Sequence, residues 1–226
     1  MTQQVTRSFV AEIIGPAGSG KTTLSRLLQN GTSVRAGLSV WKLPLSLLLQ
    51  SALSSMPDLV RLSLQRRSDW EDFKLVIQHN ALLRLVRRER KKGSHAALLL
   101  DEGNLFALAR LREFGRNGSV EDDREGWLEK LIDSVAPELD AVIWLDASDS
   151  VLAKRIRERE KWHRVKDKSD AEIEEHLSRY RRSFEHVLKE VGKRTTRPLQ
   201  VYKFSTDQLS MDQIAASILT HAGVRA

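Results

Sequence analysis

Short apolar runs alternate with segments whose apolar residues recur at helical spacing along the 226-residue chain. The runs typical of buried strands are residues 9–14, 95–100, 141–145 and 199–204. A shorter strand, whose register the pattern does not fix, is expected within residues 33–41. Continuous apolar strands separated by helices are typical of parallel sheets covered on both faces and joined by right-handed crossovers. The pattern therefore predicts an α/β fold.

Capping residues and helix breakers place the predicted helices. They are expected at residues 22–29, 45–54, 58–65, 70–92, 104–114, 120–135, 150–159, 170–191 and 211–220. Met56-Pro57 separates two short helices, because proline lacks the N–H that continues a helix. Ser68-Asp69 is typical of an N-cap for the long helix that follows. Its apolar face is expected to consist of Trp70, Phe73, Ile77, Ala81 and Leu85.

A glycine-rich stretch joins the first strand to the first helix and matches the Walker A pattern G-x-x-x-x-G-K-[ST]. Glycines let such a loop turn its N–H groups inward around a phosphate chain, beside the positive end of the helix dipole. Lys21 is expected to reach the β- and γ-phosphates, and the Thr22 hydroxyl to bind Mg²⁺. The candidate nucleotide-binding residues are Gly15, Pro16, Ala17, Gly18, Ser19, Gly20, Lys21, Thr22 and Thr23.

A second candidate site follows the strand at residues 95–100, which ends in Asp101-Glu102. A hydrophobic strand that ends in Asp is the Walker B arrangement, whose carboxylate holds Mg²⁺ beside the P-loop hydroxyl. Asp101 is the better candidate for positioning the metal. Either carboxylate could instead accept a proton from an attacking hydroxyl group. Glu102 could also be an acidic residue that only favours the start of the next helix.

Arginines form a third candidate site after the strand at residues 141–145. Arg155 and Arg159 share one helix face, and Arg164 follows in a loop. Arginines on a mobile segment can close over a phosphoryl group and exclude water. The alternative is a solvated helix with i,i+4 charge pairs.

Composition and charge limit the remaining classes of function. The chain has no cysteine, so a disulfide framework and a thiolate metal site are excluded. There is no signal-peptide pattern and no apolar run long enough to span a membrane, and we expect a cytoplasmic protein. The net charge of +7 suits an anionic ligand. No nucleic-acid-binding motif accompanies this charge, so a nucleic-acid partner is not expected. The sequence leaves open whether the chain forms a homodimer.

The P-loop, Leu-Leu-Leu-Asp at 98–101, Val-Ile-Trp-Leu-Asp at 142–146 and the arginine-rich segment resemble the P-loop kinases of the nucleoside and nucleotide kinase group. The ending at 204–214 is similar to that of thymidylate kinases. The resemblance implies one three-layer P-loop NTPase domain over residues 1–226, with a five-stranded parallel sheet in the order 2-3-1-4-5. It also implies ATP and Mg²⁺, a helical acceptor region at about 42–92 and a lid at about 155–168. Ser205, Thr206 and Asp207 would then line the base site.

The chain departs from that family after its third strand. Thymidylate kinases follow the Asp with Arg, and deoxynucleoside kinases have Glu-Arg there, whereas this chain has Asp101-Glu102-Gly103. Arg110, Arg112 or Arg116 could compensate. Aromatic residues of the acceptor region, such as Trp41, are more often core than ligand platform. Our first hypothesis is an ATP- and Mg²⁺-dependent kinase for a small-molecule acceptor, and the alternatives are a P-loop ATPase switch and a nucleic-acid-associated ATPase. No Asn-Lys-x-Asp motif of a GTPase and no Ser-Gly-Gly signature of an ABC-type ATPase is present.

Overall fold

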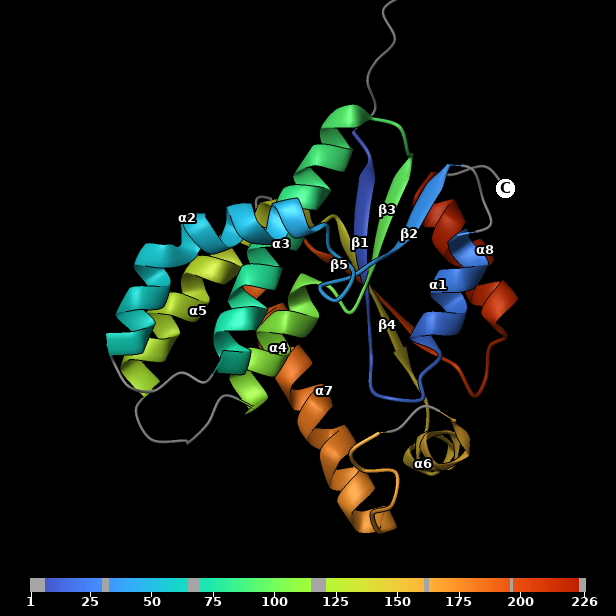
Figure 1. Ribbon diagram of the computed structural model, residues 1–226. Coiled ribbons are helices and arrows are strands. Elements are labelled where there is room, and N and C mark those ends of the chain that lie inside the picture. The colour runs from blue at the N-terminus through green and yellow to red at the C-terminus, as the bar shows by residue number, and fades with distance from the viewer. Residues whose placement is uncertain are drawn as a thin grey trace, which may run out of the picture.

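Five parallel strands form one sheet in the order β2-β3-β1-β4-β5, as predicted (Figure 1). The computed structural model describes residues 7–29, 33–64, 70–114, 121–160, 163–195 and 197–223. The strands are β1 (Phe9–Ile14), β2 (Val34–Leu38), β3 (Ala97–Asp101), β4 (Ala141–Asp146) and β5 (Gln200–Ser205). Central β1 pairs with β3 and β4, and its residue Ile13 lies opposite both Asp101 and Ile143. This register brings the ends of β1 and β3 side by side.

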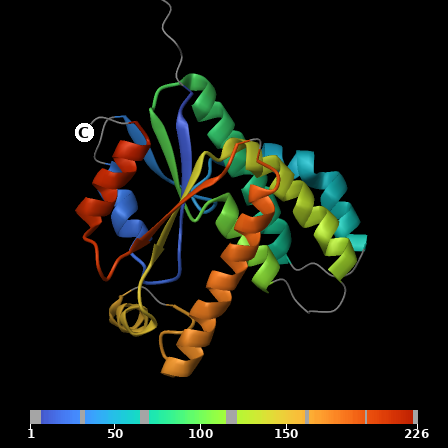
Figure 2. The same ribbon diagram turned by 180° about the vertical axis from the view of Figure 1, so that it is seen from behind.

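Helices cover both faces of the sheet, which confirms the predicted three layers (Figures 1 and 2). On one face lie α1 (Lys21–Gln29) and α8 (Met211–His221). On the other lie α2 (Leu45–Leu64), α3 (Trp70–Lys92), α4 (Asn104–Phe114), α5 (Glu121–Val135) and α7 (Asp170–Gly192). A 3₁₀ turn, η1 (Ala136–Glu138), follows α5, and α6 (Asp149–Glu158) lies beyond the end of β4.

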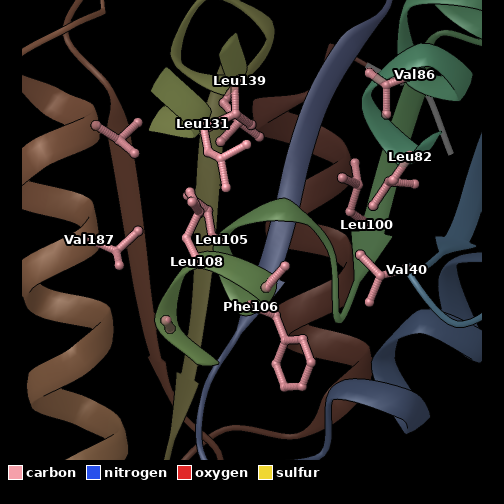
Figure 3. Close-up of a cluster of buried hydrophobic side chains, with 14 of the residues drawn as sticks. Val40, Leu82, Val86, Leu100, Leu105, Phe106, Leu108, Leu131, Leu139 and Val187 are labelled. Atoms are coloured by element: carbon pink, nitrogen blue, oxygen red, sulfur yellow. The ribbon is translucent and has the colours of Figure 1, made fainter. Parts of the chain in front are cut away.

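The side chains of β1 alternate between two cores, as the two-residue period of a strand requires. Ala11 and Ile13 enter the core against α1 and α8. Val10 and Ile14 enter the larger core under α3 and α4. Figure 3 shows this larger core, in which Leu105 and Leu108 of α4 lie over the sheet while the ring of Phe106 extends away from it.

Helix α2 corrects one prediction. The two short helices expected on either side of Met56-Pro57 are a single helix with Pro57 inside it. A proline removes one hydrogen bond from a helix interior, and tertiary packing can hold the helix through that loss. Here α2 packs along α3, where the Asn80 side-chain amide donates to the hydroxyl of Ser55 at 2.9 Å.

The predicted apolar face of α3 is correct only in part. Ala81 and Leu85 are buried as expected, but Trp70 is 74% exposed. The buried face also contains Leu75, Leu82 and Val86, and it includes the polar residues Gln78, His79 and Glu89. The predicted N-cap at Ser68-Asp69 lies outside the described residues.

Serine side chains cap the two C-terminal helices. Ser169 begins α7 with a reciprocal capping box to Glu172, and Ser210 does the same for α8 with Gln213. Ser148 stands at the N-cap position of α6, but its side chain makes no capping hydrogen bond. No helix within the described part of the chain is both long and apolar enough to cross a membrane.

Candidate functional site

The glycine-rich loop at the end of β1 packs closely against the backbones of β4 and α6. Gly15 has φ 143°, and a Cβ there would lie 2.0 Å from the carbonyl oxygen of Leu145 in β4. Gly18 has φ 83° and lies against α6, where a Cβ would meet the Leu152 carbonyl oxygen at 3.2 Å. Both positions therefore require glycine, by conformation and by space. The loop leads directly into α1, whose first residues line the cavity described below.

Lys21 folds back over this loop. Its Nζ donates to the carbonyl oxygens of Gly15 at 2.7 Å and Pro16 at 3.0 Å. Burial lowers the pKa of Lys21 from its ordinary value, and the negative charges of Glu102 and Asp101 oppose that shift. The lysine thus has only neutral carbonyl partners in these hydrogen bonds, and an incoming phosphate would replace them with a charged acceptor.

The P-loop residues lie around one cavity of about 640 Å³. Those that line it are Gly15, Ala17, Gly18, Gly20, Lys21, Thr22 and Thr23. Pro16 does not line the cavity and contributes its carbonyl to Lys21 and to the N–H of Ser19. Ser19 is fully buried, and its hydroxyl has no hydrogen-bond partner among the described residues. A buried unpaired hydroxyl in a phosphate-binding loop fits a site that is completed by a ligand.

Asp101 and Glu102 differ in their relation to the cavity. Glu102 lines it, whereas Asp101 is the last residue of β3 and is partly buried. Glu102 has φ 55°, a left-handed conformation that is rare outside glycine. Its carbonyl oxygen accepts from the N–H of Val40 at 3.1 Å, which ties the bend to the chain after β2. Backbone strain held by neighbouring contacts is common at functional sites.

A magnesium ion fits the oxygen donors at this end of the sheet. The described residues contain no group of three or more His, Cys, Asp or Glu side chains that could hold a metal. Mg²⁺ does not need such a cage, because it is usually bound by one or two carboxylates together with substrate phosphates and water. The Thr22 hydroxyl and the Asp101 carboxylate supply donors of that kind.

The three predicted lid arginines all line the cavity. Arg155 is fixed: its Nη1 donates to the Gly18 carbonyl at 3.3 Å and to the Thr206 hydroxyl at 2.9 Å. Arg159 follows the end of α6, and its carbonyl accepts from Lys166 Nζ at 2.6 Å. Arg164 lies further along the same loop.

The predicted base-site residues form the turn after β5. The Ser205 hydroxyl donates to Asp207, whose other oxygen accepts from the N–H of Ser148 at 3.0 Å. These hydrogen bonds lower the pKa of Asp207 to about 2. Thr206 is buried and its carbonyl accepts from Arg155 at 3.0 Å. Ser205, Thr206 and Asp207 do not line the cavity, and they hold Arg155 and the start of α6 in place.

An aromatic wall forms one side of the cavity, and most of its residues were not predicted from the sequence. Successive ring contacts join Trp41 to Phe106 at 6.2 Å, Phe106 to Tyr180 at 6.5 Å and Tyr180 to His176 at 5.7 Å. His163 continues the row at 5.7 Å from His176. These five residues come from four different parts of the fold, so no local sequence pattern predicts that they lie together. Trp41, expected to be core, is 38% exposed and lines the cavity.

The same wall carries a charged residue and two neutral histidines. Arg110 of α4 lines the cavity, and its guanidinium carbon lies 5.5 Å from the centre of the Trp41 ring. It therefore lies on the aromatic side of the cavity, and it is one of the arginines that could compensate for the departure at Gly103. Arg112 does not line the cavity, and Arg116 lies outside the described residues. Burial, with nearby cations, lowers the pKa values of His163 and His176 to about 4.

Comparison with known proteins identifies the fold. The sequence matches no protein-family model and no curated protein. Among solved structures, thymidylate kinase from Candida albicans is 11% identical with a TM-score of 0.55, and the match covers 95% of this chain and 91% of that chain. The chain has the fold of the nucleoside and nucleotide kinases. YorR from Bacillus subtilis, solved in complex with phosphorylated GDP, is 18% identical with a TM-score of 0.51, covering 95% of each chain. The resemblance predicted from the P-loop and the strand endings is thus confirmed for the fold.

Proposed function

We propose that this protein is a kinase that transfers the γ-phosphoryl group of ATP to a hydroxyl group of a small-molecule acceptor. One observation carries the proposal: a single cavity joins Lys21 of the phosphate-binding loop to Glu102 and to the aromatic wall. A P-loop ATPase switch needs the phosphate-binding side alone. The second, aromatic side of the cavity supports a reaction with a second substrate.

The residues of the loop would bind and orient the triphosphate. N–H groups of the glycine-rich loop and of the first turn of α1 would surround the β-phosphate. Lys21 would leave the Gly15 and Pro16 carbonyls and pair with the γ-phosphate. Arg159 and Arg164 would neutralise the charge that spreads over the transferred group and exclude water from it. When bound at Thr22 and Asp101, Mg²⁺ would supply further neutralisation of the phosphate charge.

Glu102 is the residue we assign as general base, because it lines the cavity and Asp101 does not. The acceptor oxygen would form a bond to the γ-phosphorus while the bond from that phosphorus to the β–γ bridging oxygen breaks. The hydroxyl proton would pass to the Glu102 carboxylate, and ADP would leave. A positioned carboxylate of this kind contributes roughly 10²–10⁴-fold to the rate.

The acceptor is expected to contain a planar ring, since Trp41, Phe106 and Tyr180 form an extended apolar surface beside Arg110. A nucleoside fits this description, because its base can lie against aromatic rings and its sugar carries the hydroxyl group. The neutral state of His163 and His176 lets each imidazole both donate and accept a hydrogen bond to such a ligand.

An ATP-consumption screen tests the proposal. Purified protein is given ATP and Mg²⁺ with nucleosides, nucleotides, sugars or lipid-linked acceptors, and ADP formation is followed. We expect ADP formation that depends on one of the nucleosides and disappears in Lys21→Ala. The matched control is Lys154→Ala, because Lys154 is an exposed lysine of α6 that pairs only with Glu158 among the described residues. Acceptor-independent ATP turnover would instead favour the ATPase switch.

A further inference from the structure

A glutamate lies in the middle of the central, largely buried strand β1. Glu12 belongs to β1, is fully buried and stands between Val10 and Ile14 on the face that enters the larger core. Burying a carboxylate in an apolar core is unfavourable unless hydrogen-bond donors compensate. The donors that compensate for Glu12 lie 93 and 94 residues further along the chain.

Those donors are the N-terminal backbone amides of α4. One Glu12 oxygen accepts from the N–H of Leu105 and the other from the N–H of Phe106, each at 2.9 Å. Gly103 occupies the capping position before α4 and has no side chain that could accept hydrogen bonds from these amides. A Cβ at Gly103 would lie 2.8 Å from the Glu12 carboxyl carbon and 2.8 Å from Leu100 Cβ. Glu12 therefore caps α4 from another element, and the space it needs excludes any side chain at position 103.

The capped segment is the one that forms the acceptor side of the cavity. Glu102 directly precedes Gly103, and Phe106 and Arg110 stand on the first two turns of α4. All three residues line the cavity, whereas Glu12 does not. The start of α4 has a second attachment, in which the Asn104 side-chain amide donates to the His79 carbonyl at 2.9 Å.

We propose that Glu12 is a positioning residue. By capping the N-terminus of α4, it fixes the positions of Glu102, Phe106 and Arg110 at the cavity. The capping role stands on the structure alone, and only its effect on phosphoryl transfer rests on the proposed function. The carboxylate must be ionised for this role, because the hydroxyl oxygen of a protonated carboxyl group becomes a donor and is a much weaker acceptor than a carboxylate oxygen. Its protonation would leave a buried N–H of Leu105 or Phe106 without a full partner.

The surroundings of Glu12 bring that protonation into an accessible pH range. Burial raises the pKa of Glu12 to about 7, although the backbone N–H groups of residues 103–106 oppose the rise. Titratable or charged side chains on the elements packed around it include Asp101 of β3, the following Glu102, His79 of α3 and Arg110 of α4. The largest influences on the Glu12 pKa are burial and these backbone amides, not a charged side chain.

Amide and indole resonances of ¹⁵N-labelled full-length protein provide a test that needs no substrate. We expect the Leu105 and Phe106 amides to titrate with a midpoint near pH 7, together with the amide of Glu102 and the indole N–H of Trp41, which contacts Phe106. In Glu12→Gln the four signals should not titrate there. Wild-type titration in that variant, or unchanged amide signals in the wild type while the Glu12 carboxyl group itself titrates, would overturn the capping role.

Kinetics with ATP and the acceptor found by the screen then test the effect on transfer. We expect Glu12→Gln and Glu12→Asp to lower kcat on the order of 10- to 100-fold and to leave the KM for ATP unchanged, since neither keeps both hydrogen bonds. The pH dependence of kcat near 7 should be lost in Glu12→Gln.

The control is Glu89→Gln, which alters another buried glutamate, held by Arg35 and Lys92 away from the cavity. Equal losses in Glu12→Gln and Glu89→Gln would indicate general destabilisation and overturn the positioning role. If the wild type transfers no phosphoryl group to any acceptor, the proposed function fails, while the resonances still decide whether Glu12 holds the acceptor side.

Discussion

Arg155 joins the phosphate-binding loop to the turn after β5 through Thr206. Its guanidinium donates to the Thr206 hydroxyl at 2.9 Å and to the Thr206 carbonyl at 3.0 Å, while Nη1 also reaches the Gly18 carbonyl. Three segments far apart in the sequence thus share one side chain. Arg155 is held before any nucleotide binds, so its first effect concerns the shape of the ATP site.

We therefore expect Arg155→Lys to raise the KM for ATP about 10-fold with a smaller change in kcat, because lysine lacks the planar fork that bonds both Thr206 oxygens. Steady-state kinetics with varied ATP would measure this. The control is Arg157→Lys, since Arg157 stands on the same helix and pairs with Asp170 instead. A fall in kcat at unchanged KM would mean that Arg155 acts on the transferred group as a lid residue.

Neutralising Glu102 and neutralising its neighbour Asp101 should change the Mg²⁺ dependence of the rate differently. Glu102→Gln is expected to lower kcat by roughly 10²–10⁴-fold at any Mg²⁺ concentration, because it removes the proposed base. Asp101→Asn should instead require more Mg²⁺ for half-maximal rate. Titration of the rate with MgCl₂ at saturating ATP separates the two. The assignments would be reversed if Asp101→Asn lost rate independently of Mg²⁺.

Local patterns predicted the fold and the glycine-rich loop that lines one side of the cavity. The P-loop lies within one short stretch, so the order of its glycines and lysine is enough to recognise the motif. Continuous apolar strands predicted the parallel sheet, and the resemblance to P-loop kinases supplied the strand order that the structure confirms.

The aromatic wall of the cavity could not be predicted in the same way. Trp41, Phe106, Tyr180 and His176 meet only after the chain has folded, and each alone is typical of a core residue. Glu12 did leave a signal, a charged residue inside a buried strand, but its partners in α4 are distant in sequence. Pro57 indicated a helix break because local propensity does not include the packing of α2 on α3.

His79 predicts how stability depends on pH. It is fully buried, and burial lowers its pKa to about 4. Between pH 4 and 6.5 the unfolded chain binds a proton that the folded chain excludes, so the free energy of unfolding rises with pH across this window. The contribution of His79 reaches at most about 3 kcal/mol. Glu12, whose pKa is raised to about 7, acts with the opposite sign between pH 4.5 and 7.

Urea unfolding at pH 4.5 and 7 of the wild type and His79→Gln isolates the histidine, because the Glu12 contribution is common to both proteins. We expect the variant to lose less stability than the wild type on acidification. His221→Gln, which changes an exposed histidine of α8, serves as the control. Parallel pH profiles for the wild type and His79→Gln would contradict the assignment.

Helix α2 presents Leu45, Leu49 and Leu53 to solvent and buries Ser51 and Ser55, which predicts a homodimer. Ser51 and Ser55 are buried against α3. The exposed face carries Leu45, Leu49, Leu53, Met56 and Val60, which are 51–74% exposed. From Leu49 onward the spacing is four, three and four residues, as in the seam between two packed helices.

A second copy of the chain is the occupant that this face fits best. Residues 43–57 contain no charged side chain, so two identical faces meet without like-charge repulsion. An interfacial membrane helix would instead carry Lys and Arg along its polar side. We expect light scattering after gel filtration to give the mass of a dimer of the 25.7 kDa chain. Leu49→Glu with Leu53→Glu should give the monomer, whereas Gln50→Glu, beside the face, should remain dimeric. A wild-type monomer at micromolar concentration would contradict the dimer. If that monomer binds anionic vesicles, the face is assigned to a membrane surface, and if it does not, neither a second copy nor a membrane occupies the face.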